Sequence, residues 1–352
     1  MKGLPKKLLQ LTLIGILATA LLASSQPSDF NLTTAARSGP QTVFVALLDF
    51  PDEPSGFTVQ QYADAINGMC SYIASSSYGA ASMVPTITPI FYTLPQPSTY
   101  YGLHKSRSLI ATDALAVLAP DYGDVLNDYN LVIYCFPQVA DWGLSGFYQA
   151  QQIWMNGRCN TWLFTHEAGH FYGLGHAGKW VPCDLTNPVD LCGQRQDHGD
   201  CYDMMGEQGA DHDFNPFEKQ AMGWIGTAQL HYVTATGIYR VHRFDSPSAG
   251  GFTRLALVFP QPGGTNRTYY VAYRYDFLPA GAYVMWIEFS GVSTLIDYVS
   301  TTPKCEDAYV PVGGSILDQG LIISTVDLGG TDPDRWIDVQ VTLPSDSPSP
   351  SP

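Results

Sequence analysis

Three histidines and one glutamate lie within eleven residues, in the segment HEAGHFYGLGH at 166–176. On a helix, His166 and His170 lie four residues apart on one face, where their ring nitrogens can bind a single metal ion. Glu167 is turned about 100° from His166 around the helix axis. It can therefore reach a water molecule on that ion without binding the ion itself. These residue types at this spacing predict a hydrolytic metal centre.

Gly173 is a natural end for this helix, because glycine takes the left-handed conformation at little cost, and a turn there would bring His176 to the same ion. Three neutral imidazoles and one open position are the ligand set of a catalytic zinc site. Zinc would lower the pKa of bound water toward ~7, and Glu167 would take its proton as the water attacks a carbonyl. Histidines that only pack on a helix are disfavoured, because the extended motif arises by chance on the order of once in a hundred thousand chains. We therefore predict His166, His170 and His176 as ligands of one Zn²⁺ ion.

The histidine helix is predicted over residues 161–172. Phe164, Ala168 and Phe171 are spaced at i, i+4 and i+7, so they would bury the face opposite the metal in a core. The helix would thus have one face for chemistry and one for packing.

A second helix is predicted at 215–224. Asn215 can cap it, Pro216 suits its first turn, and Glu218 would complete a capping box. Its role is predicted to be structural, beneath the metal site. The side chains expected on its buried side are Phe217, Ala221 and Trp224.

Strands and helices alternate ahead of the histidine helix. Residues 41–50 and 129–137 are apolar runs typical of buried strands, whereas 58–79 and 106–119 show helical spacing. A strand is also predicted within 83–94, at a sheet edge because it contains two prolines. This order predicts layers of helices on a sheet.

Beyond about residue 228 the pattern changes to short β-rich runs separated by Gly, Pro, Asn and Asp. Residues 229–344 are therefore predicted to form an all-β sandwich. Residues 41–228 would form the metal-site domain, with a twisted mixed sheet, so the predicted fold class is α+β. The Ser/Pro repeat at 345–352 would be an extended, solvated tail.

The N-terminus has the features of a signal peptide at residues 1–25, with three lysines before an apolar run and small residues at the cleavage site. An uncleaved membrane anchor is the alternative, but the apolar run is short for a bilayer. Residues 26–40 form a short polar segment, brief for a prodomain and without cysteine. The protein is therefore predicted to be secreted and extracellular, with no membrane span after cleavage.

The formal net charge is −15, with only 17 lysines and arginines among 352 residues. No basic stripe is available to track a phosphate backbone, so nucleic acid is excluded as an expected partner. The composition, 45% apolar and 14% charged, is that of a globular protein.

Seven cysteines are present, which leaves at least one unpaired within the chain. Cys183, Cys192 and Cys201 are spaced nine residues apart, wider than zinc-finger spacing. Disulfides are therefore favoured over a second metal site, as export would permit. Asn31 and Asn266 fit the N-glycosylation pattern.

The remaining histidines and a run of aspartates carry weaker signals. The histidines lack paired spacing and are expected to be solvated or hydrogen-bonded: His104, His198, His212, His231 and His242. The aspartates could hold calcium, but without EF-hand spacing a solvated acidic loop is the favoured interpretation: Asp184, Asp190, Asp197, Asp200, Asp203, Asp211 and Asp213.

HExxHxxGxxH followed by a methionine turn is the metzincin signature. The chain resembles one branch, the gametolysin-type (autolysin-like) metallopeptidases, over about residues 41–225. Beyond the zinc motif, the similarity lies in SSSYGAASM (75–83), WGLSGFYQAQQIWMNG (142–157), HGDCYDMMG (198–206) and FNPFEKQAMGW (214–224).

The resemblance implies roles for particular residues. His166, His170 and His176 would be the zinc ligands and Glu167 the general base. Met205, which precedes a glycine, would be the turn methionine and an apolar floor under the zinc; Met204 is the alternative. Several metzincins place a tyrosine two residues after this methionine, where this chain has Glu207, and Tyr202 nearby has no assigned role.

The leading hypothesis is a secreted zinc endopeptidase that cleaves extracellular-matrix or cell-wall proteins. The resemblance points to proline-rich or hydroxyproline-rich wall glycoproteins as substrates. One alternative is a matrix-binding structural protein with a vestigial metal site, which would adhere through its β-rich region without turnover. Another is a metal-dependent hydrolase of a non-peptide substrate.

Overall fold

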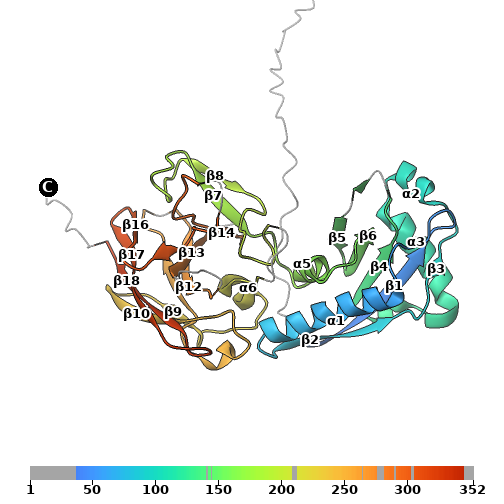
Figure 1. Ribbon diagram of the computed structural model, residues 1–352, viewed down its shortest axis with the longest axis horizontal. Helices are drawn as coiled ribbons and strands as arrows, with labels where there is room; N and C mark the ends of the chain where they lie inside the picture. The colour runs from blue at the N-terminus through green and yellow to red at the C-terminus, as the bar shows by residue number, and fades with distance from the viewer. Residues whose placement is uncertain are drawn as a thin grey trace, which may run out of the picture.

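The structure is a computed structural model that describes residues 37–139, 142–143, 145–207, 212–263, 265–275, 281–288, 291–302 and 305–344. Figure 1 shows two bodies side by side, one built from residues before about 172 and one from residues after about 178. The described chain is mixed α/β with three sheets and few helices, which is compatible with the predicted α+β class. The predicted signal peptide, most of the polar segment after it, and the Ser/Pro tail lie outside the described residues.

Six strands of the described chain form the first sheet, in the order β2-β1-β4-β6-β5 with β3 also paired to β1. Strand β5 runs antiparallel to β6 at one edge, and the other pairs are parallel, so the sheet is mixed. Pro85 lies in β2 at the opposite edge, as its missing N–H predicted. The strands are β1 (Gly39–Asp49), β2 (Ala81–Ile87), β3 (Tyr92–Thr93), β4 (Leu131–Phe136), β5 (Ser145–Gln149) and β6 (Gln152–Asn156).

Helices cover both faces of this sheet. Val43, Val45 and Leu47 of β1 belong to a core shared with α1 and α5, and the alternate residues of the strand face a second core shared with α3. The apolar run at 41–50 is therefore buried on both faces, as predicted. The helices of the described chain are α1 (Val59–Ser76), α2 (Ser98–His104), α3 (Arg107–Tyr122), α4 (Val125–Asp128), α5 (Thr161–Phe171), α6 (Pro216–Ala221) and the 3₁₀ turn η2 (Ala249–Gly251).

The second body contains two sheets that share one apolar core, as in a sandwich. Its four-stranded sheet has the order β10-β18-β17-β16, with strands β10 (Gly237–His242), β16 (Ser315–Asp318), β17 (Leu321–Gly329) and β18 (Trp336–Thr342). Its eight-stranded sheet has the order β8-β7-β14-β13-β12-β11-β9, with β15 paired to β13. These strands are β7 (Gly178–Pro182), β8 (Gly193–Gln196), β9 (Leu230–Tyr232), β11 (Ala256–Pro260), β12 (Thr268–Tyr273), β13 (Gly281–Ile287), β14 (Ser293–Leu295) and β15 (Val310–Pro311).

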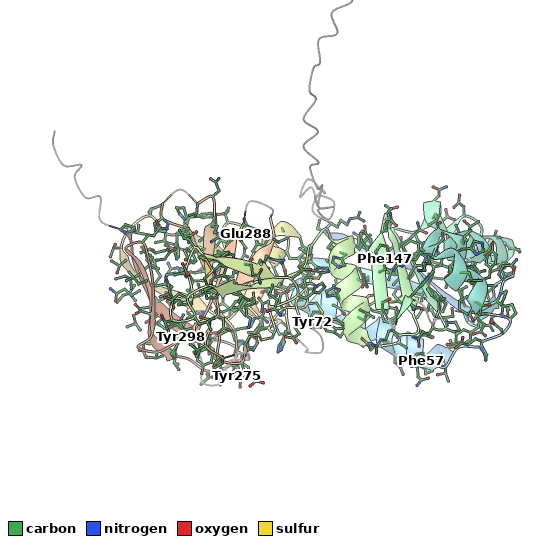
Figure 2. The ribbon with its side chains drawn as sticks, turned by 90° about the horizontal axis from the view of Figure 1, so that it is seen from above. Phe57, Tyr72, Phe147, Tyr275, Glu288 and Tyr298 are labelled. Carbon is green, nitrogen blue, oxygen red and sulfur yellow. A yellow bond between two sulfur atoms is a disulfide. The ribbon has the colours of Figure 1, made fainter. Side chains whose placement is uncertain are left out.

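The strand pairing crosses the predicted domain boundary at residue 228. Strand β7 begins two residues after His176 and pairs in parallel with β14, where Gly178 lies opposite Thr294. In Figure 2, Phe147 lies in one body, Glu288 in the other, and Tyr72 near the place where they meet. The three-histidine segment therefore ends at the junction of the two bodies.

Two disulfides link segments of the second body. Cys183 pairs with Cys192 across the β7–β8 connection, and Cys201 pairs with Cys305 over 104 residues. The preference for disulfides over a second metal site is thus confirmed for these cysteines, and the other three are free: Cys70, Cys135 and Cys159. None of the described helices has the length and apolar character needed to span a bilayer.

The predicted solvated acidic loop is wrong for two of its aspartates. Asp184 and Asp197 are exposed, but Asp200 and Asp203 are 0% and 1% exposed. Asp203 lies 3.9 Å from Arg274, which is itself fully buried, and Asp200 accepts a hydrogen bond from the hydroxyl group of Tyr283. Charge pairing between segments far apart in the sequence overrides the usual exposure of carboxylates, because an ion can be buried when a counter-ion and hydrogen bonds accompany it.

Helix α6 contributes to the same buried network. The capping box of Asn215 and Glu218 forms as predicted, and Asn215 also donates two hydrogen bonds of 2.9 Å to Asp203. The predicted buried side is only partly right. Trp224 is buried, but Glu218 and Lys219 are buried as well, whereas Phe217 and Ala221 are half-buried. The charge of Lys219 is balanced there by the carboxylate of Asp213, which lies 2.6 Å from its Nζ atom.

We expect Arg274→Met to lower the free energy of unfolding by about 3–5 kcal/mol, because the buried carboxyl group of Asp203 would lose the guanidinium group that lies 3.9 Å away. Urea denaturation at neutral pH measures the loss. Adding Asp203→Asn to the same protein should restore part of it. The control is Arg240→Met, since that side chain is 47% exposed in its pair with Asp338 and should cost much less. Equal losses for the two arginines would refute the importance of the buried pair.

Candidate metal centre

Helix α5 carries His166, Glu167 and His170, and it ends at Phe171, one residue before the predicted end. The side chain of Asn160 caps its start by accepting a 2.8 Å hydrogen bond from the backbone of Leu163. The chain leaves the helix at Gly173, whose φ of 94° places it in the left-handed region. The predicted turn after the helix is thus present, for the predicted reason.

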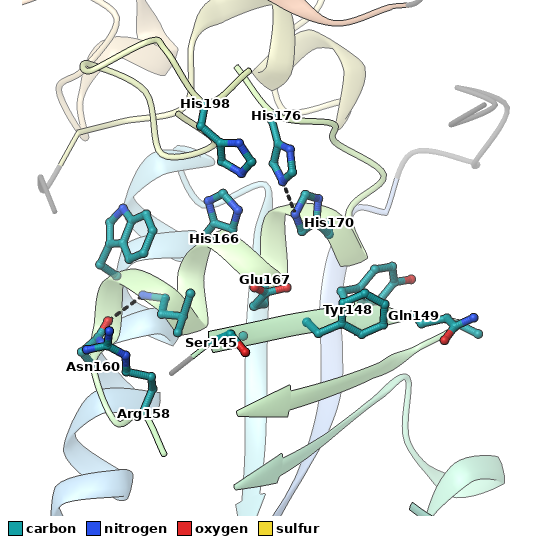
Figure 3. Close-up of a pocket in the computed structure, with 15 residues that line it drawn as sticks. Ser145, Tyr148, Gln149, Arg158, Asn160, His166, Glu167, His170, His176 and His198 are labelled. Atoms are coloured by element: carbon teal, nitrogen blue, oxygen red, sulfur yellow. Dashed lines mark hydrogen bonds between the residues drawn. The ribbon is translucent and has the colours of Figure 1, made fainter. Parts of the chain in front are cut away.

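The structure brings the three predicted ligands together. Nitrogen atoms of His166, His170 and His176 all lie within 4.8 Å of one another, and the Nε2 atoms of His170 and His176 are 3.2 Å apart. The ring centroids are separated by 4.8–5.5 Å in the three pairs. Figure 3 shows the three rings above Glu167, at the top of a cavity. The arrangement is a candidate metal-binding cluster.

The other nitrogen of each ring already has a partner. Nδ1 of His166 lies 2.9 Å from the backbone carbonyl oxygen of Met204, and Nδ1 of His170 lies 2.8 Å from that of Leu174. Nδ1 of His176 lies 3.1 Å from the carboxylate of Asp197. A carbonyl can only accept, so Nδ1 of the first two rings carries the proton and Nε2 keeps its lone pair. This is the outer-shell pattern of metal-ligating histidines.

Burial keeps two of these imidazoles neutral. It lowers the pKa of His166 to about 3 and, with the carbonyl of Leu174 opposing the shift, the pKa of His170 to about 4. A neutral ring is the form that binds a metal ion. The donor set therefore fits a divalent ion that takes nitrogen ligands, such as zinc.

Glu167 is 4% exposed and lies where its carboxyl group lines the same cavity as the three histidines. Burial raises its pKa to about 8, against the positive charge of Arg107. A cation bound by the histidines would act in the same direction as Arg107 and favour the carboxylate. Strand β5 approaches this group closely at Gly146, where any side chain would overlap Glu167. The carboxyl group is thus held between the helix and the edge strand.

The two candidate turn methionines have different contacts. Met205 is fully buried, and its sulfur packs against Gly169 of α5, where a side chain would overlap it. Met204 contributes its backbone carbonyl, which accepts the hydrogen bond from His166. Met205 therefore lies directly beneath the segment that carries the histidines, and Met204 orients one of them.

His198 and Asp197 are two neighbours of the cluster that were not predicted. His198, expected only to be solvated or hydrogen-bonded, stacks on His176 with ring centroids 3.5 Å apart, and its Nδ1 lies 3.1 Å from Asp197. The ligand atoms of His198 lie within 4.8 Å of those of His176 and Asp197, which makes a second candidate metal group, whereas the first group consists of His166, His170 and His176. His198 has no paired spacing with another histidine in the sequence, and it lies beside His176 only because the chain returns after β8.

A cavity of about 700 Å³ opens in front of the cluster. It is lined by β5, by one face of α5, and by His176 and His198 (Figure 3). Because β5 is an edge strand, its outer backbone groups can pair with an extended peptide. The cavity is therefore suited to a peptide that passes the cluster.

Other candidate metal groups are weaker. Cys183, Asp190 and Cys192 lie close together, but the two cysteines form a disulfide and cannot be thiolate ligands. Among the described residues, no such group consists of carboxylates alone, so the calcium alternative gains no support.

No family model matches the chain, and no curated protein matches it. The resemblance to metzincins therefore rests on the motif residues themselves. The arrangement of those residues in space is independent of that resemblance.

Proposed function

We propose that this protein is a zinc-dependent endopeptidase of the gametolysin-like metzincin type. The observation that carries the proposal is the convergence of His166, His170 and His176 beside the buried carboxyl group of Glu167, in a cavity bordered by an edge strand. Three imidazole ligands leave a position open, which is the ligand set of catalytic rather than structural zinc.

The residues divide the chemistry between them. A zinc ion held by the three histidines would supply the Lewis acidity that activates water and polarises a carbonyl group. Glu167 would accept the proton of the attacking water and pass it to the leaving amine. Strand β5 would hold the substrate backbone by antiparallel pairing, so that one carbonyl group faces the cluster.

The substrate class extends the same proposal. The two disulfides are compatible with an exported protein. The motif resemblance favours extracellular-matrix or cell-wall proteins, including proline-rich wall glycoproteins. Cleavage of such proteins, rather than adhesion alone, separates this proposal from a matrix-binding protein with a vestigial metal site.

Metal removal tests the proposed function. The purified protein should contain about one zinc per chain and cleave casein at sites that mass spectrometry can map. Treatment with 1,10-phenanthroline should abolish cleavage, and added zinc should restore it, whereas the non-chelating 1,7 isomer should have no effect. Undiminished cleavage in the chelator, or no turnover by zinc-loaded protein, would refute the proposal.

A further inference from the structure

One cation lines the cavity at the end away from the histidines. Arg158 lies two residues before the cap of α5 and is half-buried in the cavity wall. Figure 3 shows Arg158 and Asn160 together near the start of the helix, with Glu167 farther along it. The guanidinium group is thus available to a molecule in the cavity.

Arg158 is exceptional among the arginines of this acidic protein. All ten arginines fall within the described residues, and Arg158 alone has no hydrogen bond, ion pair or ring contact there. Of the other nine, two lie over aromatic rings and one donates to a backbone carbonyl. The remaining six pair with carboxylates: Arg195, Arg240, Arg243, Arg267, Arg274 and Arg335.

A half-buried cation without a counter-ion has lost hydration that nothing in the described chain replaces. Glu167 is the one acidic residue among the described residues that line the cavity, and it lies beside the histidines rather than beside Arg158. A carboxylate brought by the substrate would restore the missing partner through a charge-assisted, two-pronged hydrogen bond.

The position along the helix sets where that carboxylate would be. Glu167 is seven positions after Asn160, which corresponds to about 10 Å at the helical rise of about 1.5 Å per residue. An extended peptide advances about 3.3 Å per residue. The carboxylate therefore lies within about three residues of the bond presented to Glu167.

We propose that Arg158 is a specificity-determining residue that binds a substrate carboxylate within three residues of the cleaved bond. The proposal rests on the proposed function, because it assumes a peptide in this cavity. The carboxylate can belong to an aspartate or glutamate side chain or to a peptide C-terminus, and both present the same chemistry to a guanidinium group. Phosphate groups of nucleic acid are disfavoured as the anion by the net charge of −15.

The test compares decapeptides based on casein cleavage sites, each with Glu, Gln or Lys at one of the three positions on either side of the bond. At one or more positions the wild-type protein should prefer Glu over Gln by roughly tenfold in kcat/KM. Arg158→Gln should bring that ratio close to one, and Arg158→Glu should favour Lys instead. Arg240→Gln, far from the cavity on β10, is the matched control and should keep the wild-type ratio.

A second arm identifies the source of the carboxylate, with shortened peptides that end in a free acid or an amide. A ratio near one at every position and in both arms, or a preference that survives Arg158→Gln, would overturn the proposal. Binding keeps this outcome separate from failure of the proposed function. Fluorescein-labelled Glu and Gln peptides can be titrated into Glu167→Gln protein, where an Arg158-dependent difference in Kd needs no turnover.

Discussion

Glu167→Gln should lower kcat for peptide cleavage by roughly a thousandfold while zinc remains bound. Glutamine has nearly the same size as glutamate, so it can occupy the space that Gly146 leaves beside the helix. It cannot accept a proton from water at neutral pH. Because Glu167 is not one of the converging ring ligands, its loss should leave the metal site intact.

Stopped assays of one casein-derived peptide, combined with zinc analysis of the same preparation, measure this effect. The variant should hold about one zinc per chain and melt close to the wild-type temperature. Glu53→Gln is the matched control, because Glu53 is exposed and does not line the cavity. A Glu167→Gln protein with activity within tenfold of wild type would rule out Glu167 as the general base.

His170→Ala should weaken zinc binding by about a hundred- to a thousandfold. Zinc sites of four ligands bind with roughly 10–16 kcal/mol, or about 2.5–4 kcal/mol for each ligand. Asp197→Asn should cost less, about 10–100-fold, because Asp197 is not in the three-histidine group and contacts His176 at its Nδ1 atom. His198→Ala should change affinity by no more than a few-fold, since its ring stacks on His176 outside the cluster geometry.

Competition with a chromophoric chelator measures the three dissociation constants in one series, and circular dichroism checks that each variant is folded. The order of effects is the informative result. If His198→Ala weakens zinc binding as much as His170→Ala does, then His198 is a fourth ligand and no coordination position is left open. Unchanged affinity in His170→Ala would remove the three-histidine site itself.

The sequence by itself determined the local parts of this protein. The stop at Gly173 and the capping box at Asn215 depend on residues within one helical turn. The buried strand at 41–50 follows from an unbroken apolar run. Spacing within one helix also placed His166 and His170 on the same face. Such features are readable because they depend on a few neighbouring residues, whose backbone preferences and periodicity are local.

Tertiary structure alone decided how distant segments complete the site. The pairing of β7 with β14 joins residues 178–179 to residues 294–295, and no local sequence pattern predicts this pairing. Arg274, directly after β12, lies beside Asp203 and allows its burial, and His198 lies beside His176 only because the chain returns after β8. Burial and ion pairing are properties of the assembled interior, so an aspartate that looks solvated in the sequence can become a buried ion. The lone Arg158 in the cavity wall is recognisable for the same reason, because only the folded chain shows which charges have found a partner.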